Sequence, residues 1–271
     1  MPRPAHRTRR TTRTAGAGTA ALLVLGAVTA CSSSSDDPSS RSSSGKPAGT
    51  VTVFAAASLT ESFTTLGEEF EKAHPGTEVT FNFGGSDSLA AGITGGAPAD
   101  VFASASPWTM RIVTDAGSAS GTPVTFVRNR LEIATLPGNP EGVSSLKDLT
   151  GPKLKVVLCD RKVPCGAAAQ KALDAGGLDF TPVSYEQDVK SALTKVELKE
   201  ADAALVYRTD VRAAGDKVEG VDFPEAAEAV NDYPITLLKD APNAGAGQAF
   251  IAFVRSDEGR RVLADAGFLT S

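Results

Sequence analysis

Two serines, Ser58 and Ser86, hold the same place in two copies of one local sequence pattern. In each copy a short apolar run leads into small residues, then the serine, then apolar residues at helical spacing. The start of a helix carries unpaired backbone N–H groups and a partial positive charge, which together bind an anion without a charged side chain. The repeat therefore predicts two helix N-termini, each opened by a serine, that face one cleft and hold an anion there.

Each copy has its own local signals. In the first, the predicted strand over residues 51–54 is followed by three alanines that leave room for a ligand, and Glu61 stands three residues after Ser58, the spacing of a capping box. In the second, Gly84 and Gly85 allow the backbone to approach a ligand closely. A serine at a helix start is more often a plain cap worth about 1 kcal/mol, so these patterns leave a purely structural role open.

Three later positions fit the same scheme. Cys165 stands at the start of an alanine-rich helix over residues 167–175, and Asp188 is a predicted cap that makes Val189 another helix-start amide. Tyr207 ends a buried strand, and the carboxyl ends of strands in α/β sheets line the ligand crevice. On its own, Tyr207 is equally well explained as a packed aromatic residue.

The order of the segments predicts an α/β protein. Short apolar strands alternate with helical segments, as is typical of parallel sheets covered by helices. About 220 residues follow position 49, enough for one large domain or two lobes. Trp108, the only tryptophan, is expected to pack in the interior rather than to contact a ligand, and Gly267 is expected to end the last helix.

The N-terminus has the features of an export signal with a lipid anchor. Residues 1–30 combine five arginines with an uncharged run too short to span a membrane comfortably, so we predict a secretory signal peptide. Because threonines flank Arg9 and Arg10, the general export route is favoured over the twin-arginine route. The four residues ending at Cys31 resemble a lipobox, so we predict that Cys31 is lipidated and anchors the mature protein to the outer face of the membrane. Residues 31–49 hold almost nothing that can pack, which predicts a disordered tether.

Charge and histidine content argue against several function classes. Removing the five arginines of the signal from the 27 Lys and Arg leaves 22 against 32 Asp and Glu, a net charge of −10, which disfavours nucleic-acid binding. His6 leaves with the signal and His74 falls where a helix ends, so neither a Ser-His-Asp site nor a site for a free metal cation is expected. No nucleophile elbow is present either, so no catalytic residue is assigned and an enzyme is not expected.

Cys159 and Cys165 are the two cysteines that remain once Cys31 is lipidated. They are close in sequence and lie in an exported chain, so a disulfide is the favoured interpretation. A loop this short gains only about 2 kcal/mol from a disulfide, so its main effect is to fix the turn before the helix start. Catalytic or metal-binding cysteines are the weaker alternative, because no Cys-x-x-Cys spacing is present.

Seven motifs, in order and at similar spacing, resemble those of the molybdate-binding proteins of ABC importers. They are FAAASLT at Phe54–Thr60, FGGSDSLA at Phe83–Ala90, GAPADVF at Gly96–Phe102, Asp188-Val189, Val206-Tyr207, Tyr233-Pro234 and Ala266–Phe268. The resemblance implies the type II periplasmic-binding-protein fold, in which two α/β lobes are joined by two crossover segments. The crossovers are expected near residues 127–130 and 232–235. Lobe one is then formed by residues 50–128 and 234–271, and lobe two by residues 129–233.

The resemblance also implies a ligand set for molybdate or tungstate. Ser58 and Ser86 from lobe one each give a hydroxyl and a backbone N–H. Lobe two gives the backbone N–H groups of Cys165 and Val189 and the phenol of Tyr207. The metal enters only as part of the oxyanion, and no cofactor is expected.

Two positions depart from the family pattern. Cys165 stands where the family has a small residue such as alanine, and Asp87 places a carboxylate near the anion, where we expect it to point away. The implied partners of this expected monomer are an ABC permease, which recognises the closed form, and the membrane, through the N-terminal lipid. A carrier of sulfate or phosphate, and a ligand-free interaction lipoprotein on the same fold, are the alternatives.

Overall fold

A computed structural model describes residues 46–270 of the 271-residue chain. The predicted signal peptide, the lipidation site at Cys31 and most of the predicted tether lie outside these residues. Within residues 46–270, no helix is both long enough and apolar enough to cross a membrane.

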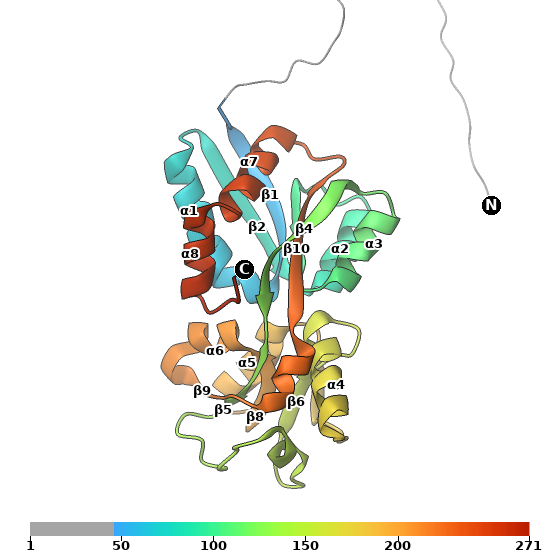
Figure 1. Cartoon of the computed structure of the whole chain (residues 1–271), viewed down its shortest axis with the longest axis vertical. Coiled ribbons are helices and arrows are strands. Elements are labelled where there is room, and N and C mark those ends of the chain that lie inside the picture. Colours follow the sequence, from blue (N-terminus) through green and yellow to red (C-terminus); the bar gives the residue numbers. More distant parts are fainter. Residues whose placement is uncertain (1–45, 271) are drawn as a thin grey trace, which may run out of the picture. The chain divides into compact units, whose positions relative to one another are not determined.

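Two five-stranded sheets form the framework (Figure 1). In spatial order the first contains β2 (Thr77–Gly84), β1 (Gly49–Ala56), β3 (Val101–Ala103), β10 (Asn231–Leu238) and β4 (Ala119–Asn129). The second contains β7 (Ser184–Glu186), β6 (Val156–Cys159), β8 (Ala203–Tyr207), β5 (Leu131–Thr135) and β9 (Glu219–Val221). In both sheets the first three strands are parallel and the fourth is antiparallel to its neighbours.

Helices cover both faces of the first sheet. One face carries α1 (Thr60–Ala73), α7 (Ala244–Val254) and α8 (Asp257–Asp265), and the other carries α2 (Ser86–Thr94) and α3 (Pro107–Asp115) (Figure 1). The alternation of side chains along β1 produces these two layers. Val51 and Val53 pack into the core with Phe63 of α1, whereas Phe54 packs into the opposite core with Leu89 of α2.

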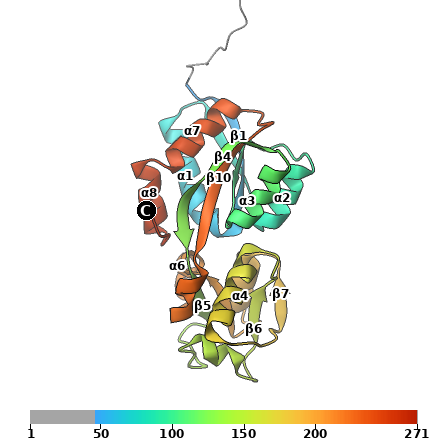
Figure 2. The same ribbon diagram turned by 45° about the vertical axis from the view of Figure 1, so that its right-hand side comes forward.

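The second sheet is covered by α4 (Pro164–Gly176) and α6 (Arg208–Ala214), which Figure 2 shows, and by α5 (Val189–Glu197), labelled in Figure 1. Its middle strands are apolar throughout, since all five residues of β8 are buried. Short 3-10 turns complete the fold at η1 (Ala57–Leu59), η2 (Leu146–Thr150), η3 (Gly215–Lys217) and η4 (Pro224–Ala229).

The chain passes between the two sheets twice. β4 of the first sheet ends at Asn129, and β5 of the second begins at Leu131. The return passage lies at about residues 230–231, where β10 begins and next to the predicted segment, because η4 just before it still packs against α4 and β5 of the second half. The antiparallel pairing of β4 with β10 puts Asn129 opposite Asn231, so the two passages meet side by side.

β4 and β9 were not predicted from the sequence, and the predicted interior position of Trp108 is wrong. Both strands lie at a sheet edge, where one side is unpaired and the apolar pattern is weak. Trp108 is 49% exposed. The buried face of α3 is set by Met110 and Val113, and a residue two positions before Met110 points to the opposite side of a helix.

Candidate anion-binding site

The carboxyl ends of six parallel strands, three from each sheet, meet around one cavity. Open α/β sheets bind their ligands at the carboxyl ends of the parallel strands. Six residues that follow or end these strands line the cavity. They are Ser58 after β1, Ser86 after β2, Ala105 after β3, Cys165 after β6, Val189 after β7 and Tyr207 at the end of β8. The five ligand residues predicted from the sequence therefore lie together.

The cavity is small and has few charged neighbours. It offers about 20 Å³ to the centre of a water-sized sphere, slightly more than a single water needs. Among residues 46–270, the side chains that line it include no lysine, arginine or histidine. Its acidic member is Asp188, whose carboxylate accepts hydrogen bonds from the backbone N–H (2.9 Å) and hydroxyl (3.0 Å) of Ser191. Asp87 does not line it. A cavity of this kind suits a compact anion held by neutral donors.

Ser58 lies in the 3-10 turn η1 and does not cap α1. The predicted capping box with Glu61 is wrong, because Leu59 is the N-cap residue and no side chain caps this helix start. Glu61 instead accepts hydrogen bonds from Lys190 Nζ at 2.7 and 2.8 Å. The intervening turn moves the helix start past Ser58 and frees its buried hydroxyl, which hydrogen-bonds Tyr233 Oη at 2.8 Å.

Ser86 is the first residue of α2, with Gly85 at the N-cap position. Its N–H has no carbonyl one turn earlier in the helix and is free for a ligand. A Cβ atom at Gly85 would lie 2.7 Å from the carbonyl oxygen of Gln187, whereas one at Gly84 would meet nothing nearer than Leu89, at 3.8 Å. Gly84 and Gly85 were both predicted to allow a close approach of the backbone, but only the position of Gly85 requires a glycine.

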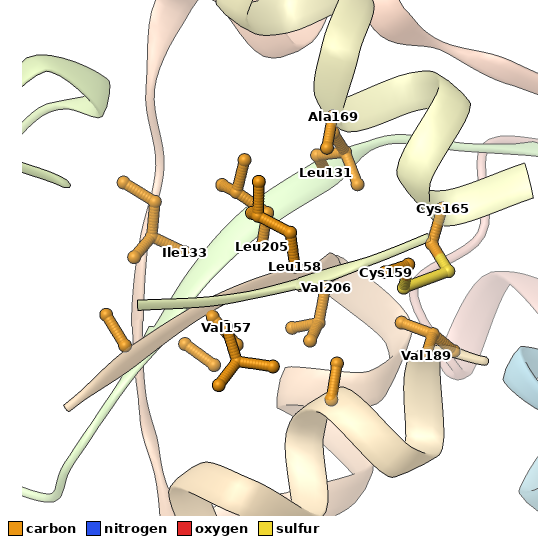
Figure 3. Packing of buried hydrophobic residues seen from close by; sticks show 14 of the residues in the cluster. Leu131, Ile133, Val157, Leu158, Cys159, Cys165, Ala169, Val189, Leu205 and Val206 are labelled. Carbon is orange, nitrogen blue, oxygen red and sulfur yellow. A yellow bond between two sulfur atoms is a disulfide. The ribbon is translucent and has the colours of Figure 1, made fainter. Parts of the chain in front are cut away.

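The start of α4 is held by a disulfide between Cys159, at the end of β6, and Cys165 (Figure 3). Their Cα atoms are 5.8 Å apart. Pro164 occupies the first helical turn and has no N–H, so the first amide that α4 offers a ligand is that of Cys165. The loop packs tightly here, because a Cβ at Gly166 would lie 1.9 Å from the carbonyl oxygen of Asp160. The amide of Cys165 is therefore fixed by covalent and steric contacts.

The start of α5 follows the sequence prediction. Asp188 is the N-cap, and its side chain accepts the N–H of Ser191 at 2.9 Å. The cap satisfies one helix-start amide and leaves that of Val189 without an intrahelical partner. The side chain of Val189 is buried in the core of the second sheet, the same cluster that holds the disulfide (Figure 3).

Tyr207 is the last residue of β8 and is 1% exposed. Burial raises the pKa of its phenol well above the ordinary value, so the group keeps its proton. Its oxygen lies 2.7 Å from Nδ2 of Asn231. Tyr207 thus packs as a core aromatic residue and also presents a hydroxyl to the cavity, so both interpretations of the sequence apply.

Three buried polar residues behind the cavity were not assigned a role from the sequence. Asn129, Asn231 and Tyr233 lie where β4 and β10 pair, and each is at most 6% exposed. Buried amides and phenols are almost always hydrogen-bonded, so the signal that points to these residues is a polar side chain beside the apolar run of β10.

A charged cluster lies close behind Tyr207. Asp210 is fully buried, its Oδ2 accepts the backbone N–H of Tyr207 at 3.2 Å, and its Oδ1 is 3.1 Å from Lys190 Nζ. Lys190 also contacts Glu61, so it ties α5 to α1 across the two halves of the molecule. Burial raises the pKa of Asp210 to about 6, even though the Lys190 charge opposes the shift.

This raised pKa makes stability depend on pH. The ordinary value is 3.8, so folding takes up a proton between about pH 4 and 6. The contribution of Asp210 to stability is therefore fullest at low pH and falls as the pH rises through about 6. The variant Asp210→Asn cannot titrate but keeps an acceptor for Tyr207. We expect the unfolding free energy of the wild type, relative to this variant, to fall by up to about 3 kcal/mol between pH 4 and 7 in urea titrations. A constant difference over that range contradicts the shift.

The family is shown by comparison with known proteins. A family model described as bacterial extracellular solute-binding protein matches residues 51–269. The chain belongs to this family. The solute-binding protein is 44% identical over 235 residues to the molybdate-binding protein ModA of Mycobacterium tuberculosis (strain ATCC 25618 / H37Rv), covering 84% of this chain and 90% of that one. It is 31% identical to ModA of Haemophilus influenzae, covering 80% and 89%.

Solved structures agree with the predicted fold of the solute-binding protein. The substrate binding domain of a putative molybdenum ABC transporter from Clostridium difficile is 28% identical, with a TM-score of 0.63, covering 83% of this chain and all of that one. The periplasmic molybdate-binding protein of Azotobacter vinelandii, at 20% identity, has a TM-score of 0.71 and covers 82% and 99%. The α/β periplasmic-binding-protein fold is confirmed. The relatives are solute-binding proteins and not enzymes.

Proposed function

We propose that this solute-binding protein captures molybdate or tungstate outside the cytoplasm and delivers it to an ABC permease. The observation that carries the proposal is a cavity at six strand ends where hydroxyl and N–H groups converge without a basic side chain in the lining among residues 46–270. The 44% identity to a protein named for molybdate supports the choice among anions.

We propose the ligand set that the family resemblance implies. Ser58 and Ser86 donate from lobe one, and Cys165, Val189 and Tyr207 donate from lobe two. The lobes, residues 50–128 with 234–271 and residues 129–233, close on the ion, and the permease recognises the closed form.

The binding mechanism rests on fixed dipoles. A tetrahedral dianion surrounded by N–H and O–H donors is stabilised by charge-assisted hydrogen bonds and by the starts of α2, α4 and α5. An oxyanion that keeps a proton binds less well, because that proton finds no acceptor. The smaller sulfate does not reach all donors at once, so size selects molybdate and tungstate over it.

The anchoring and assembly follow from the N-terminal sequence. We propose that lipidated Cys31 holds the monomeric protein at the outer face of the cell membrane through the tether of residues 31–49. A tether of that composition leaves the binding lobes free to meet the permease.

Calorimetric titration with molybdate, tungstate, sulfate and phosphate in parallel tests the proposed function. Emission from Trp108 is a second readout, because Trp108 of α3 shares a surface groove with Arg161 and Pro164 from the second half. We expect molybdate and tungstate to bind with similar affinity and sulfate and phosphate to bind more weakly. Sulfate that matches molybdate contradicts the assignment, and a protein that binds none of the four is an interaction lipoprotein instead.

The variant Ser58→Ala tests one predicted donor. The buried anion loses one hydrogen bond, so molybdate affinity should fall by roughly 1 to 3 kcal/mol, about 5- to 150-fold, in the same titration. Ser62→Ala is the matched control, since Ser62 is equally buried in the adjoining helix but bonds only the carbonyl of Leu59. Equal affinities for the two variants count against Ser58 as a ligand.

A further inference from the structure

All three hydroxyl groups of the cavity have an oxygen within hydrogen-bond distance of another protein group. The simplest case is Ser86, whose Oγ accepts the backbone N–H of Ala105 at 3.0 Å. A backbone N–H can only donate, so the direction of this bond is fixed. The hydrogen of Ser86 is then free to point at a ligand.

Tyr207 is oriented by the side-chain amide of Asn231. Nδ2 of Asn231 lies 3.1 Å from the carbonyl oxygen of Ala105, 3.4 Å from that of Pro164 and 2.7 Å from Tyr207 Oη. Carbonyl oxygens only accept, so the atom that faces them must be the amide nitrogen. Tyr207 Oη therefore receives a hydrogen from Asn231, and its own hydrogen, which Asn231 does not use, is available to a ligand in the cavity that it lines.

Ser58 is oriented through two steps. Oδ1 of Asn129 accepts the backbone N–H of Arg130 at 3.0 Å, which fixes the amide so that Nδ2 faces Thr209 Oγ1 at 2.9 Å and Tyr233 Oη at 3.5 Å. Tyr233 then has its own hydrogen available for Ser58 Oγ, 2.8 Å away. Burial raises the pKa of the Tyr233 phenol above its ordinary value, so this hydrogen is retained. The hydrogen of Ser58 is left for the ligand.

We propose that Asn231, and Asn129 acting with Tyr233, are positioning residues that turn the hydroxyl hydrogens of Tyr207 and Ser58 into the cavity and thereby exclude oxyanions that keep a proton. This inference rests on the proposed function, since it assigns the specificity of that same site. None of the three residues lines the cavity, so their effect passes through Tyr207 and Ser58.

The substitution Asn231→Asp tests the proposal because aspartate has the same shape and cannot donate. The hydrogen of Tyr207 should turn to the new carboxylate, and a lone pair of the phenol should face the cavity in its place. Sulfate and phosphate are the matched probes: they have similar size, but phosphate keeps at least one proton near neutral pH. Their affinities are measured by calorimetric competition against molybdate, on the whole protein.

We expect the wild type to prefer sulfate to phosphate, and Asn231→Asp to reduce that preference by about tenfold or more, the worth of one charge-assisted hydrogen bond. The added negative charge alone lowers the affinity for both anions, so each variant is also made together with Tyr207→Phe. In that background the change in preference should disappear. Asn243→Asp, which adds the same charge where Asn243 caps α7, should leave the preference unaltered.

Three results overturn the proposal. The first is an equal loss of sulfate and phosphate affinity in Asn231→Asp. The second is a change in preference that persists with Tyr207→Phe, which assigns the effect to charge. If Asn231→Asp does not fold, Tyr233→Phe takes its place. Tyr233→Phe should lower the preference for sulfate over phosphate about threefold to tenfold, and it should cause no further change when Ser58 is already alanine. An unchanged preference in Tyr233→Phe is the third contrary result.

The same titrations separate this inference from the proposed function. A wild-type protein that binds molybdate while its variants lose both probes equally contradicts only the positioning role. A wild-type protein that binds no oxyanion contradicts both.

Discussion

Replacement of Tyr207 by phenylalanine should weaken molybdate binding by about 2 to 3 kcal/mol, roughly 30- to 150-fold. The phenol is a stronger donor than a serine hydroxyl, and it is 1% exposed, so water does not replace it in the closed site. Folding should be little affected, because Nδ2 of Asn231 keeps the carbonyl oxygens of Ala105 and Pro164 as acceptors. Calorimetry gives the affinity, and thermal denaturation without ligand gives the stability.

The control for Tyr207→Phe is the same substitution at Tyr185, which is 46% exposed. Tyr185→Phe should alter neither quantity. If Tyr207→Phe binds molybdate as well as the wild type, the phenol is not a ligand and Tyr207 is only a core residue.

Replacement of Gly85 by alanine should also reduce molybdate affinity, by up to a similar amount, through a steric route. The backbone of Gly85 has φ −59° and ψ 130°, which alanine adopts without strain. The nearest obstacle is the backbone carbonyl oxygen of Gln187, 2.7 Å from the added Cβ, and the side-chain Oδ1 of Asp87 follows at 2.9 Å. Gln187 directly precedes the cap of α5. The starts of α2 and α5 must then move apart, and overpacking of this kind costs about 1 to 3 kcal/mol.

The effect should appear in the ligand-bound form alone if the lobes open and close. We expect the affinity for molybdate to fall about 5- to 150-fold, which corresponds to the cost of about 1 to 3 kcal/mol. The melting temperature of the ligand-free protein should change little. Gly92→Ala on the same helix is the control, because its Cβ would meet neighbours at an ordinary 3.9 Å. Wild-type affinity in Gly85→Ala shows that the two helix starts need not approach this closely.

The repeated pattern of strand, small residues and helix start could be predicted from the sequence, and it located the site. Ser86 and Val189 begin helices as the local signals predict, and Tyr207 ends its strand. These features depend on neighbours in the sequence, such as the cap at Asp188. The convergence of the predicted ligands follows from parallel strands whose carboxyl ends share one edge.

What the sequence did not show depends on contacts between distant segments. Ser58 and Glu61 have the spacing of a capping box, yet their partners are Tyr233, 175 positions away, and Lys190, 129 positions away. These long-range bonds replace the local one. Tyr233 was part of a recognised motif, but no local pattern connects its hydroxyl to Ser58.

An edge strand and an exposed tryptophan were also not predicted correctly from the sequence. β4 has an edge position and contains Pro123, a residue that favours edge strands and bulges and weakens the local strand pattern. Trp108 was expected inside because tryptophan is usually well buried, but the helix that carries it buries the opposite face.

A crystal structure of the protein grown with molybdate tests the proposed anion site directly. We expect one tetrahedral ion in the cavity, within hydrogen-bond distance of the hydroxyl groups of Ser58, Ser86 and Tyr207 and of the backbone N–H groups of Cys165 and Val189. An ion bound elsewhere, or held by a lysine or arginine side chain, contradicts it.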